Sequence, residues 1–193
     1  VTGVGDTFSS GLDLNEFPTT ADCQQTLSCT ALQLVLAEMR DSPVPIVVAL
    51  NGPAFAGGAG VALAADFLVL PEDAFLQFPG AGKGIVAEVL MPILVDTVGP
   101  RRGLDWLIRG KKIQAQELQM CGIAVEVVPK AELSQATRAL CDLLEAIPAT
   151  VFATHKQLLS RTLYQDDQAG LSWTHPFQPV IHFAPTSRLP GAR

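Results

Sequence analysis

The chain has 193 residues, of which 48% are hydrophobic and 17% charged, enough apolar material for one sizeable core and for one domain, with or without a helical appendage. The formal net charge of −6 argues against nucleic acid as a partner, because phosphate-backbone binders need clustered lysine and arginine. No apolar run is long enough to span a membrane. The cysteines at 23, 29, 121 and 141 form no metal-ligand pattern with histidine, which predicts reduced thiols and no bound metal.

The first half of the chain predicts an α/β fold. Residues 3–13 are rich in Gly, Ser and Asp and predict a loop, while apolar positions within 23–40 recur at helical spacing. An unbroken β-branched run at 46–50 predicts a strand that is buried on both faces. Residues 59–65 then predict a buried helix, and 67–70 a second buried strand. Strand, helix and strand in this order make one parallel crossover unit, so the class is α/β.

The second half continues with strands and helices and ends without a clear pattern. The predicted elements are a strand at 74–79, a helix at 100–107, a strand at 123–128 and helical residues at 131–162. The helical pattern breaks near Pro148, and the tail from His175 onward has no period. We therefore divide the chain into a core over residues 1–130 and a C-terminal helical segment with an irregular tail over residues 131–193.

Two glycine-rich segments look like nucleotide-binding loops but fail on spacing. Gly80–Gly84 contains a lysine, yet a glycine stands where a P-loop needs Ser or Thr for its metal. Gly57–Gly60 follows its strand after too long a link and lacks the third small residue of a dinucleotide fingerprint. Either this glycine pair allows close helix packing, or its backbone N–H groups, at the positive end of a helix, hold an anion.

Basic residues and histidines point to no site. Arg101, Arg102, Arg109, Lys111 and Lys112 form a short basic run, which is more typical of a solvated helix end than of a site for one small anionic ligand. Both interpretations stay open on charge alone. The three histidines are scattered, and no Ser or Cys lies in a nucleophile-elbow sequence, so a histidine-based triad is not expected.

Glu88 is an acidic residue with mainly apolar neighbours in the sequence. It lies within the apolar stretch 84–92, and its nearest charged neighbour is Lys83. A carboxylate in apolar surroundings is costly to desolvate, and such groups serve enzymes as proton shuttles near neutral pH. The alternative is an ordinary glutamate on a helix surface, and the sequence alone leaves both interpretations open.

Four stretches, in this order, resemble the enoyl-CoA hydratase/isomerase (crotonase) superfamily. They are Val1–Leu14, Pro45–Asp66, Asp73–Gly84 and Gly110–Pro129. The resemblance implies a crotonase-type spiral of β-β-α units, followed by C-terminal helices that mediate assembly into a homotrimer or a dimer of trimers. It implies an acyl-CoA thioester as substrate and no separate cofactor, because coenzyme A is part of that substrate.

The shared chemistry that the resemblance implies is stabilisation of a thioester enolate by two backbone N–H groups. Carried over by position, these donors are the amides of Leu12 and Gly57. The residues expected to contact the substrate and its CoA part are Ser10, Gly11, Asp13, Leu14 and Gly58. This would explain the glycine pair, because the thioester must approach the backbone closely.

The departures from the family pattern favour one reaction. The two glutamates with which the family's hydratases activate water fall at Gly60 and Gly80, so both are absent. Glu88, at the end of a Gly-x-x-x-Glu segment, matches the single catalytic glutamate of the Δ3,Δ2-enoyl-CoA isomerases. Isomerisation needs one base, which removes a proton at C2 and returns it at C4. The resemblance therefore favours an isomerase, with another crotonase-type hydratase or hydrolase, or a non-catalytic acyl-CoA binder, as alternatives.

The two ends of the sequence carry expectations of their own. The opening Val1–Gly3 is typical of the last residues of a strand, and family members carry several dozen residues before this point, so we expect an N-terminally incomplete family pattern. The terminal Gly191–Arg193 is no peroxisomal address. The default expectation is a cytoplasmic protein, with a mitochondrial or peroxisomal one as the alternative if a targeting segment is missing.

Overall fold

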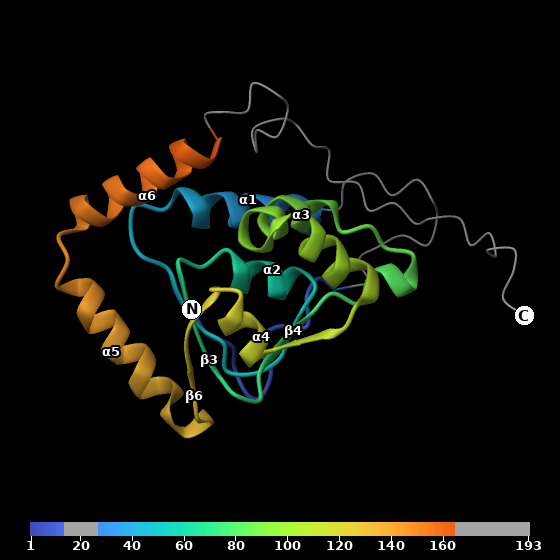
Figure 1. Ribbon diagram of the computed structural model, residues 1–193, viewed down its shortest axis with the longest axis horizontal. Helices are drawn as coiled ribbons and strands as arrows, with labels where there is room; N and C mark the ends of the chain where they lie inside the picture. The colour runs from blue at the N-terminus through green and yellow to red at the C-terminus, as the bar shows by residue number, and fades with distance from the viewer. Residues whose placement is uncertain (14–26, 165–193) are drawn as a thin grey trace, which may run out of the picture.

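The computed structural model describes residues 1–13 and 27–164, in which short strands alternate with helices (Figure 1). The helices and strands run in the order α1 (Leu27–Asp41), β1 (Val47–Ala49), β2 (Ala54–Phe55), α2 (Gly57–Leu63), β3 (Phe67–Pro71), β4 (Phe75–Gln77), α3 (Met91–Arg109), β5 (Lys112–Gln114), α4 (Ala115–Met120), β6 (Ala124–Val128), α5 (Leu133–Glu145) and α6 (Ala149–Tyr164). The 3-10 turns are η2 (Ala81–Lys83), η3 (Glu88–Leu90) and η4 (Lys130–Glu132). The start of the helix predicted at 23–40 and the tail from His175 lie outside the described residues.

Two three-stranded sheets form the centre of the fold. The first has the order β1-β3-β6 and is parallel throughout. The second has the order β2-β4-β5, in which β2 and β4 are parallel and β5 is antiparallel to β4. The N-terminal segment joins both sheets, since Thr2 bridges to Ala49 and Ser9 to Ala54. These bridges hold the N-terminal loop beside the start of α2.

The parallel pairing of β1 with β3 confirms the crossover unit predicted from the sequence. Helix α2 begins at Gly57, slightly earlier than predicted, because the glycine pair is itself helical. Helix α3 begins at Met91, but Gly99 interrupts it with φ 76° and ψ 164°, so that a second helical segment starts at Pro100, as predicted. The segment before Gly99 is not predicted from the sequence. The sequence does not predict β2, β5 or α4, which are too short to show a period.

The main core lies between the sheets and helices α1 to α4. Its largest fully buried side chain is that of Trp106 in α3. Helix α2 is buried along most of its length, including its glycines, and it packs against α1 and α3. The glycine pair therefore lies inside the protein. Among the described residues, no helix is long and apolar enough to cross a membrane.

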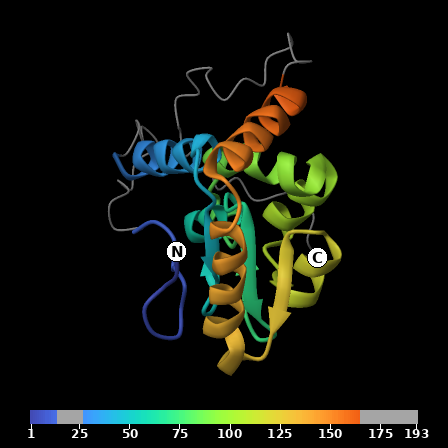
Figure 2. The same cartoon turned by 90° about the vertical axis from the view of Figure 1, so that its left-hand side faces the viewer.

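The last two helices pack on different parts of this core. Helix α5 lies over the β1-β3-β6 sheet, where Val69, Val128 and Leu133 form a small second cluster (Figure 2). The chain then leaves α5 at Glu145 and enters α6 at Ala149. This interruption confirms the break that was predicted near Pro148, and it allows α6 to turn back toward α1.

Lys156 ties α6 to the core through two hydrogen bonds. Its Nζ donates to the carbonyl of Met39 in the last turns of α1 at 2.8 Å and to Asp66 Oδ2 at 2.9 Å. The same carboxylate oxygen accepts a hydrogen bond from the backbone N–H of Ile46, just before β1, at 2.8 Å. The Lys156 and Asp66 side chains are only 14% and 17% exposed. The ion pair therefore joins α6, α1 and the first sheet at a largely covered point.

We expect Lys156→Ala to lower the free energy of unfolding by roughly 1–3 kcal/mol, because it leaves a covered carboxylate and a helix-end carbonyl without this donor. Urea denaturation of the full chain measures the change. The matched control is Lys130→Ala, which breaks an ion pair with Asp6 whose side chains are 52% and 96% exposed. That loss should stay below about 0.5 kcal/mol. Equal losses in the two variants would contradict the role given to Lys156.

Candidate active site

The first predicted donor, Leu12, lies in a loop that is fixed against β2. The Ser9 carbonyl accepts a hydrogen bond from Phe55 N–H at 2.9 Å, and Ser9 Oγ accepts one from Gly11 N–H at 3.2 Å. Gly11 has φ 91°, which favours glycine. A Cβ on Gly11 would lie 2.9 Å from the Phe55 carbonyl oxygen and 3.2 Å from the Cβ of Ala56. The glycine is thus what allows the loop to lie this close to the end of β2.

The connection between β2 and α2 carries the second predicted donor and a strained residue. Ala56 has φ 46° and ψ −115°, and it alone among the described non-glycine residues has a positive φ. Its N–H donates to the Gln77 carbonyl at 2.9 Å, and its own carbonyl accepts from Gly60 N–H at 3.0 Å. Strained backbone persists only where its surroundings fix it, and it gathers at functional sites. The first N–H groups of α2, including that of Gly57, have no carbonyl partner within the helix.

The two predicted donor residues lie side by side. A Cβ on Gly11 would be 3.5 Å from the backbone nitrogen of Gly57, and a Cβ on Gly57 would be 3.9 Å from that of Leu12. The two amides come from segments far apart in the sequence and meet because the N-terminal loop is bridged to β2. The arrangement offers two backbone amide groups near one point, as binding an oxyanion requires.

The other residues predicted to contact the substrate are near the donor pair in sequence, and the structure describes most of them. Ser10 and Asp13 lie in the same loop and are exposed, and Leu14 lies outside the described residues. Gly58 is buried, and a Cβ placed on it would overlap with Cβ and Oγ of Ser9. Close packing therefore explains Gly58, while contact with a thioester stays a prediction for these four positions and for Gly11.

Glu88 begins the turn η3 and is half-buried. This turn packs against α1 and α3, and Leu90 at its end is only 4% exposed. The Leu90 side chain reaches Gly60 in α2, where an added Cβ would lie 2.5 Å from Leu90 Cδ2. Gly60 is less than one helical turn from Gly57. Glu88 thus belongs to a segment packed on the helix that carries one donor, and its role as the base stays a prediction.

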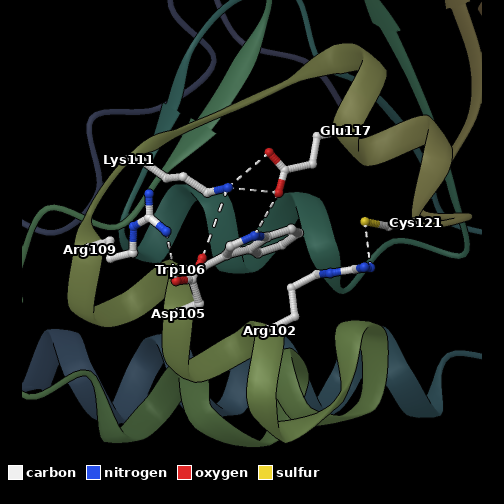
Figure 3. A network of polar contacts seen from close by, with 7 residues as sticks. All are labelled: Arg102, Asp105, Trp106, Arg109, Lys111, Glu117 and Cys121. Carbon is white, nitrogen blue, oxygen red and sulfur yellow. Dashed lines mark hydrogen bonds and ion pairs between the residues drawn. The ribbon is translucent and has the colours of Figure 1, made fainter.

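Three residues of the basic run, Arg102, Arg109 and Lys111, take part in polar contacts between α3, the residue before β5, and α4 with its C-terminal end. Figure 3 shows these contacts, which involve Arg102, Asp105, Trp106, Arg109, Lys111, Glu117 and Cys121. Lys111 Nζ lies 3.1 and 3.3 Å from the two carboxylate oxygens of Glu117, and the buried Trp106 indole N–H donates to Glu117 Oε1 at 3.0 Å. Arg109 pairs with Asp105 at 3.3 Å. Four residues of the run (Arg101, Arg102, Arg109 and Lys112) are exposed, which agrees with a solvated helix end rather than with an anion site.

The structural roles of two residues beside the donor pair, Ser9 and Ala56, are not predicted from the sequence. Ser9 could have been found, because a serine two residues ahead of a turn glycine often accepts its N–H. Ala56 gives no such indication, since alanine is an ordinary residue in helices and strands alike. Its positive φ is imposed by the hydrogen bond to Gln77 and by the start of α2.

The parallel strands, the buried helix α2 and the adjoining N-terminal loop make the chain a mixed α/β protein of the crotonase type. The crystal structure of human enoyl-CoA hydratase domain-containing protein 3 has a TM-score of 0.76 and 28% identity, over 84% of this chain and 64% of that chain. A putative enoyl-CoA hydratase from Thermobifida fusca in complex with acetoacetyl-CoA has a TM-score of 0.71 and 31% identity, over 86% of this chain and 69% of that chain.

The chain belongs to the enoyl-CoA hydratase/isomerase family, whose model matches residues 1–176. A putative enoyl-CoA hydratase from Thermus thermophilus is 33% identical over 165 residues, which are 82% of this chain and 64% of the relative. Human mitochondrial enoyl-CoA hydratase domain-containing protein 3 is 28% identical over 172 residues, which are 86% of this chain and 55% of the relative. The chain thus spans about half to two thirds of these relatives, and the family predicted from four stretches is confirmed.

Proposed function

We propose that this chain shifts the double bond of an enoyl-CoA thioester from C3 to C2. Glu88 removes a proton from C2, and the electron pair passes into the thioester to give a dienolate. The N–H groups of Leu12 and Gly57 hold the negative oxygen. The carboxyl group of Glu88 then returns the proton at C4, which restores the thioester and brings the double bond into conjugation with it. Substrate and product are isomers, so the balance is complete with one proton removed and one returned.

The observation that carries this proposal is that glycine stands at both positions where hydratases of the family hold a glutamate. Leu90 fills the space beside Gly60, whereas Gly80 is half-buried and a Cβ there would make ordinary contact with Ile85, 3.4 Å from its Cβ and from its carbonyl oxygen. Neither place offers a carboxylate to orient water, whereas Glu88 supplies one proton acceptor nearby in the sequence. A single base suits a proton shift better than the addition of water.

An acyl-CoA substrate is supported by two solved relatives. A putative enoyl-CoA hydratase from Thermobifida fusca in complex with CoA is 32% identical to this chain, and its complex with acetoacetyl-CoA is 31% identical. The paired backbone amides of Leu12 and Gly57 suit a thioester oxygen, because they act without any proton transfer of their own. The names of the relatives also include hydratases, so the choice of reaction depends on a direct assay.

The test compares two reactions of the full chain. With a 3-enoyl-CoA, we expect ultraviolet absorbance of the conjugated 2-enoyl thioester to rise; with a 2-enoyl-CoA, we expect little loss of that absorbance, because little water is added. Fast loss without any rise would replace the isomerase proposal by a hydratase. Binding of both thioesters without either change would replace it by a non-catalytic acyl-CoA binder.

A further inference from the structure

The Ser9 side chain lies between the two backbone segments that carry the proposed donors. On one side its Oγ accepts a hydrogen bond from Gly11 N–H at 3.2 Å. On the other side its Cβ and Oγ lie so close to Gly58 that no Cβ could be added there. The Ser9 backbone is held as well, because it bridges to Ala54 and accepts from Phe55 N–H at 2.9 Å. The side chain therefore has little freedom to move away from either segment.

Through these contacts Ser9 links the segment that carries Leu12 to the segment that carries Gly57. Gly11 directly precedes Leu12, and Gly58 directly follows Gly57, so Ser9 contacts the immediate neighbour of each donor. An oxyanion site is effective when its donors are already in place before charge develops on the substrate. We propose that Ser9 is the positioning residue that sets the spacing of the Leu12 and Gly57 N–H groups. This inference rests on the proposed function only in that these two amides bind a thioester oxygen.

A similar hydrogen bond occurs away from the site and provides a matched control. Ser42 Oγ accepts a hydrogen bond from Val44 N–H at 3.3 Å, so donor and acceptor are again two residues apart. Ser42 is half-buried, as Ser9 is, and it lies in the connection between α1 and β1. Ser42 Oγ also donates to the Val44 carbonyl at 3.0 Å, so Ser42→Ala removes two local hydrogen bonds where Ser9→Ala removes the one from Gly11 N–H. Neither replacement adds any atom. We therefore expect Ser9→Ala to lose no more thermal stability than Ser42→Ala.

The experiment uses two thioesters with the full chain. Acetoacetyl-CoA has an acidic C2 and forms a conjugated enolate that absorbs in the near ultraviolet, whereas butyryl-CoA is saturated and stays in its keto form. We expect Ser9→Ala to lower the enolate-to-keto ratio of bound acetoacetyl-CoA about tenfold, because only the enolate places full charge on the oxygen. The affinity for butyryl-CoA should change less than about twofold. Ser42→Ala should match the parent in both measurements.

Each other result has a distinct meaning. An unchanged enolate ratio in Ser9→Ala, with enolate present in the parent, would overturn the role of Ser9. So would an equal fall in affinity for both thioesters, or a much larger loss of thermal stability than in Ser42→Ala, since either indicates a general loss of packing. No enolate in the parent would overturn the donor pair and this inference together. Enolate that depends on Ser9, in a chain that fails to isomerise 3-enoyl-CoA, would support the inference and overturn only the reaction.

Discussion

Glu88→Gln is expected to slow the shift of the double bond by roughly 100- to 10,000-fold, the range that a positioned acid–base group contributes. Glutamine has nearly the shape of glutamate but cannot take the C2 proton. Because Glu88 is half-buried and Leu90 anchors the same turn in the core, the exchange should leave the local packing in place. The rate is measured from the absorbance of the conjugated 2-enoyl thioester, and KM should change far less than kcat.

The control for this variant is Glu132→Gln. Glu132 is an exposed glutamate in another 3-10 turn, η4, which precedes α5. The Glu132→Gln variant should isomerise the 3-enoyl-CoA at the same rate as the parent. Undiminished activity of Glu88→Gln would remove Glu88 from the mechanism. Loss of activity together with loss of affinity for a saturated acyl-CoA would place Glu88 in substrate binding and not in proton transfer.

The buried parallel strands could be predicted because their composition is set by their surroundings. Strands β1 and β3 are largely buried, so they appear as short apolar runs. Strand β6 is buried at its two ends and exposed at Val125 and Glu126, and its valines are what indicate a strand. Strands β2 and β5 could not be predicted, because two or three residues show no period and become strands only through pairing with β4. The part of α3 from Pro100 onward could be predicted, because a proline suits the start of a helix, and the non-helical backbone of Gly99 separates it from the part before. The part before Gly99, from Met91, was not predicted.

Some features of the candidate site could likewise be predicted from the sequence, and others could not. Gly11 is a glycine because the carbonyl of Phe55 leaves no room for a Cβ, and glycine marks such places in a sequence. At Gly57 the tight neighbour is the side chain of Leu32, 3.0 Å from an added Cβ. The juxtaposition of the two segments could not be predicted, since it depends on the bridge from Ser9 to Ala54. The strained backbone of Ala56 could not be predicted either, because it arises from tertiary hydrogen bonds and not from the conformational preferences of alanine.

Two glycines of the N-terminal segment allow backbone strain to be separated from the geometry of the site. Gly11 and Gly5 have φ values of 91° and 78°, so alanine is strained at both and should destabilise each variant by about 1–2 kcal/mol. A Cβ at Gly5 would meet nothing within 4 Å, whereas one at Gly11 would lie 2.9 Å from the carbonyl oxygen of Phe55. Only Gly11→Ala must therefore push the loop, and the amide of Leu12 with it, away from Gly57.

We expect Gly11→Ala to lower kcat/KM for a 3-enoyl-CoA by roughly 100-fold or more, the effect of displacing or losing one oxyanion donor. Gly5→Ala should keep most of the parent activity at a temperature where both variants are folded. Urea denaturation measures how much stability each variant has lost, Gly11→Ala being expected to lose more because of its contact with Phe55, and the isomerase assay then compares the folded proteins. Equal activities would mean that turnover does not depend on how the loop lies against β2. In that case the donor opposite Gly57 would have to come from somewhere other than Leu12, because a loop displaced at Gly11 cannot leave the next amide where it was.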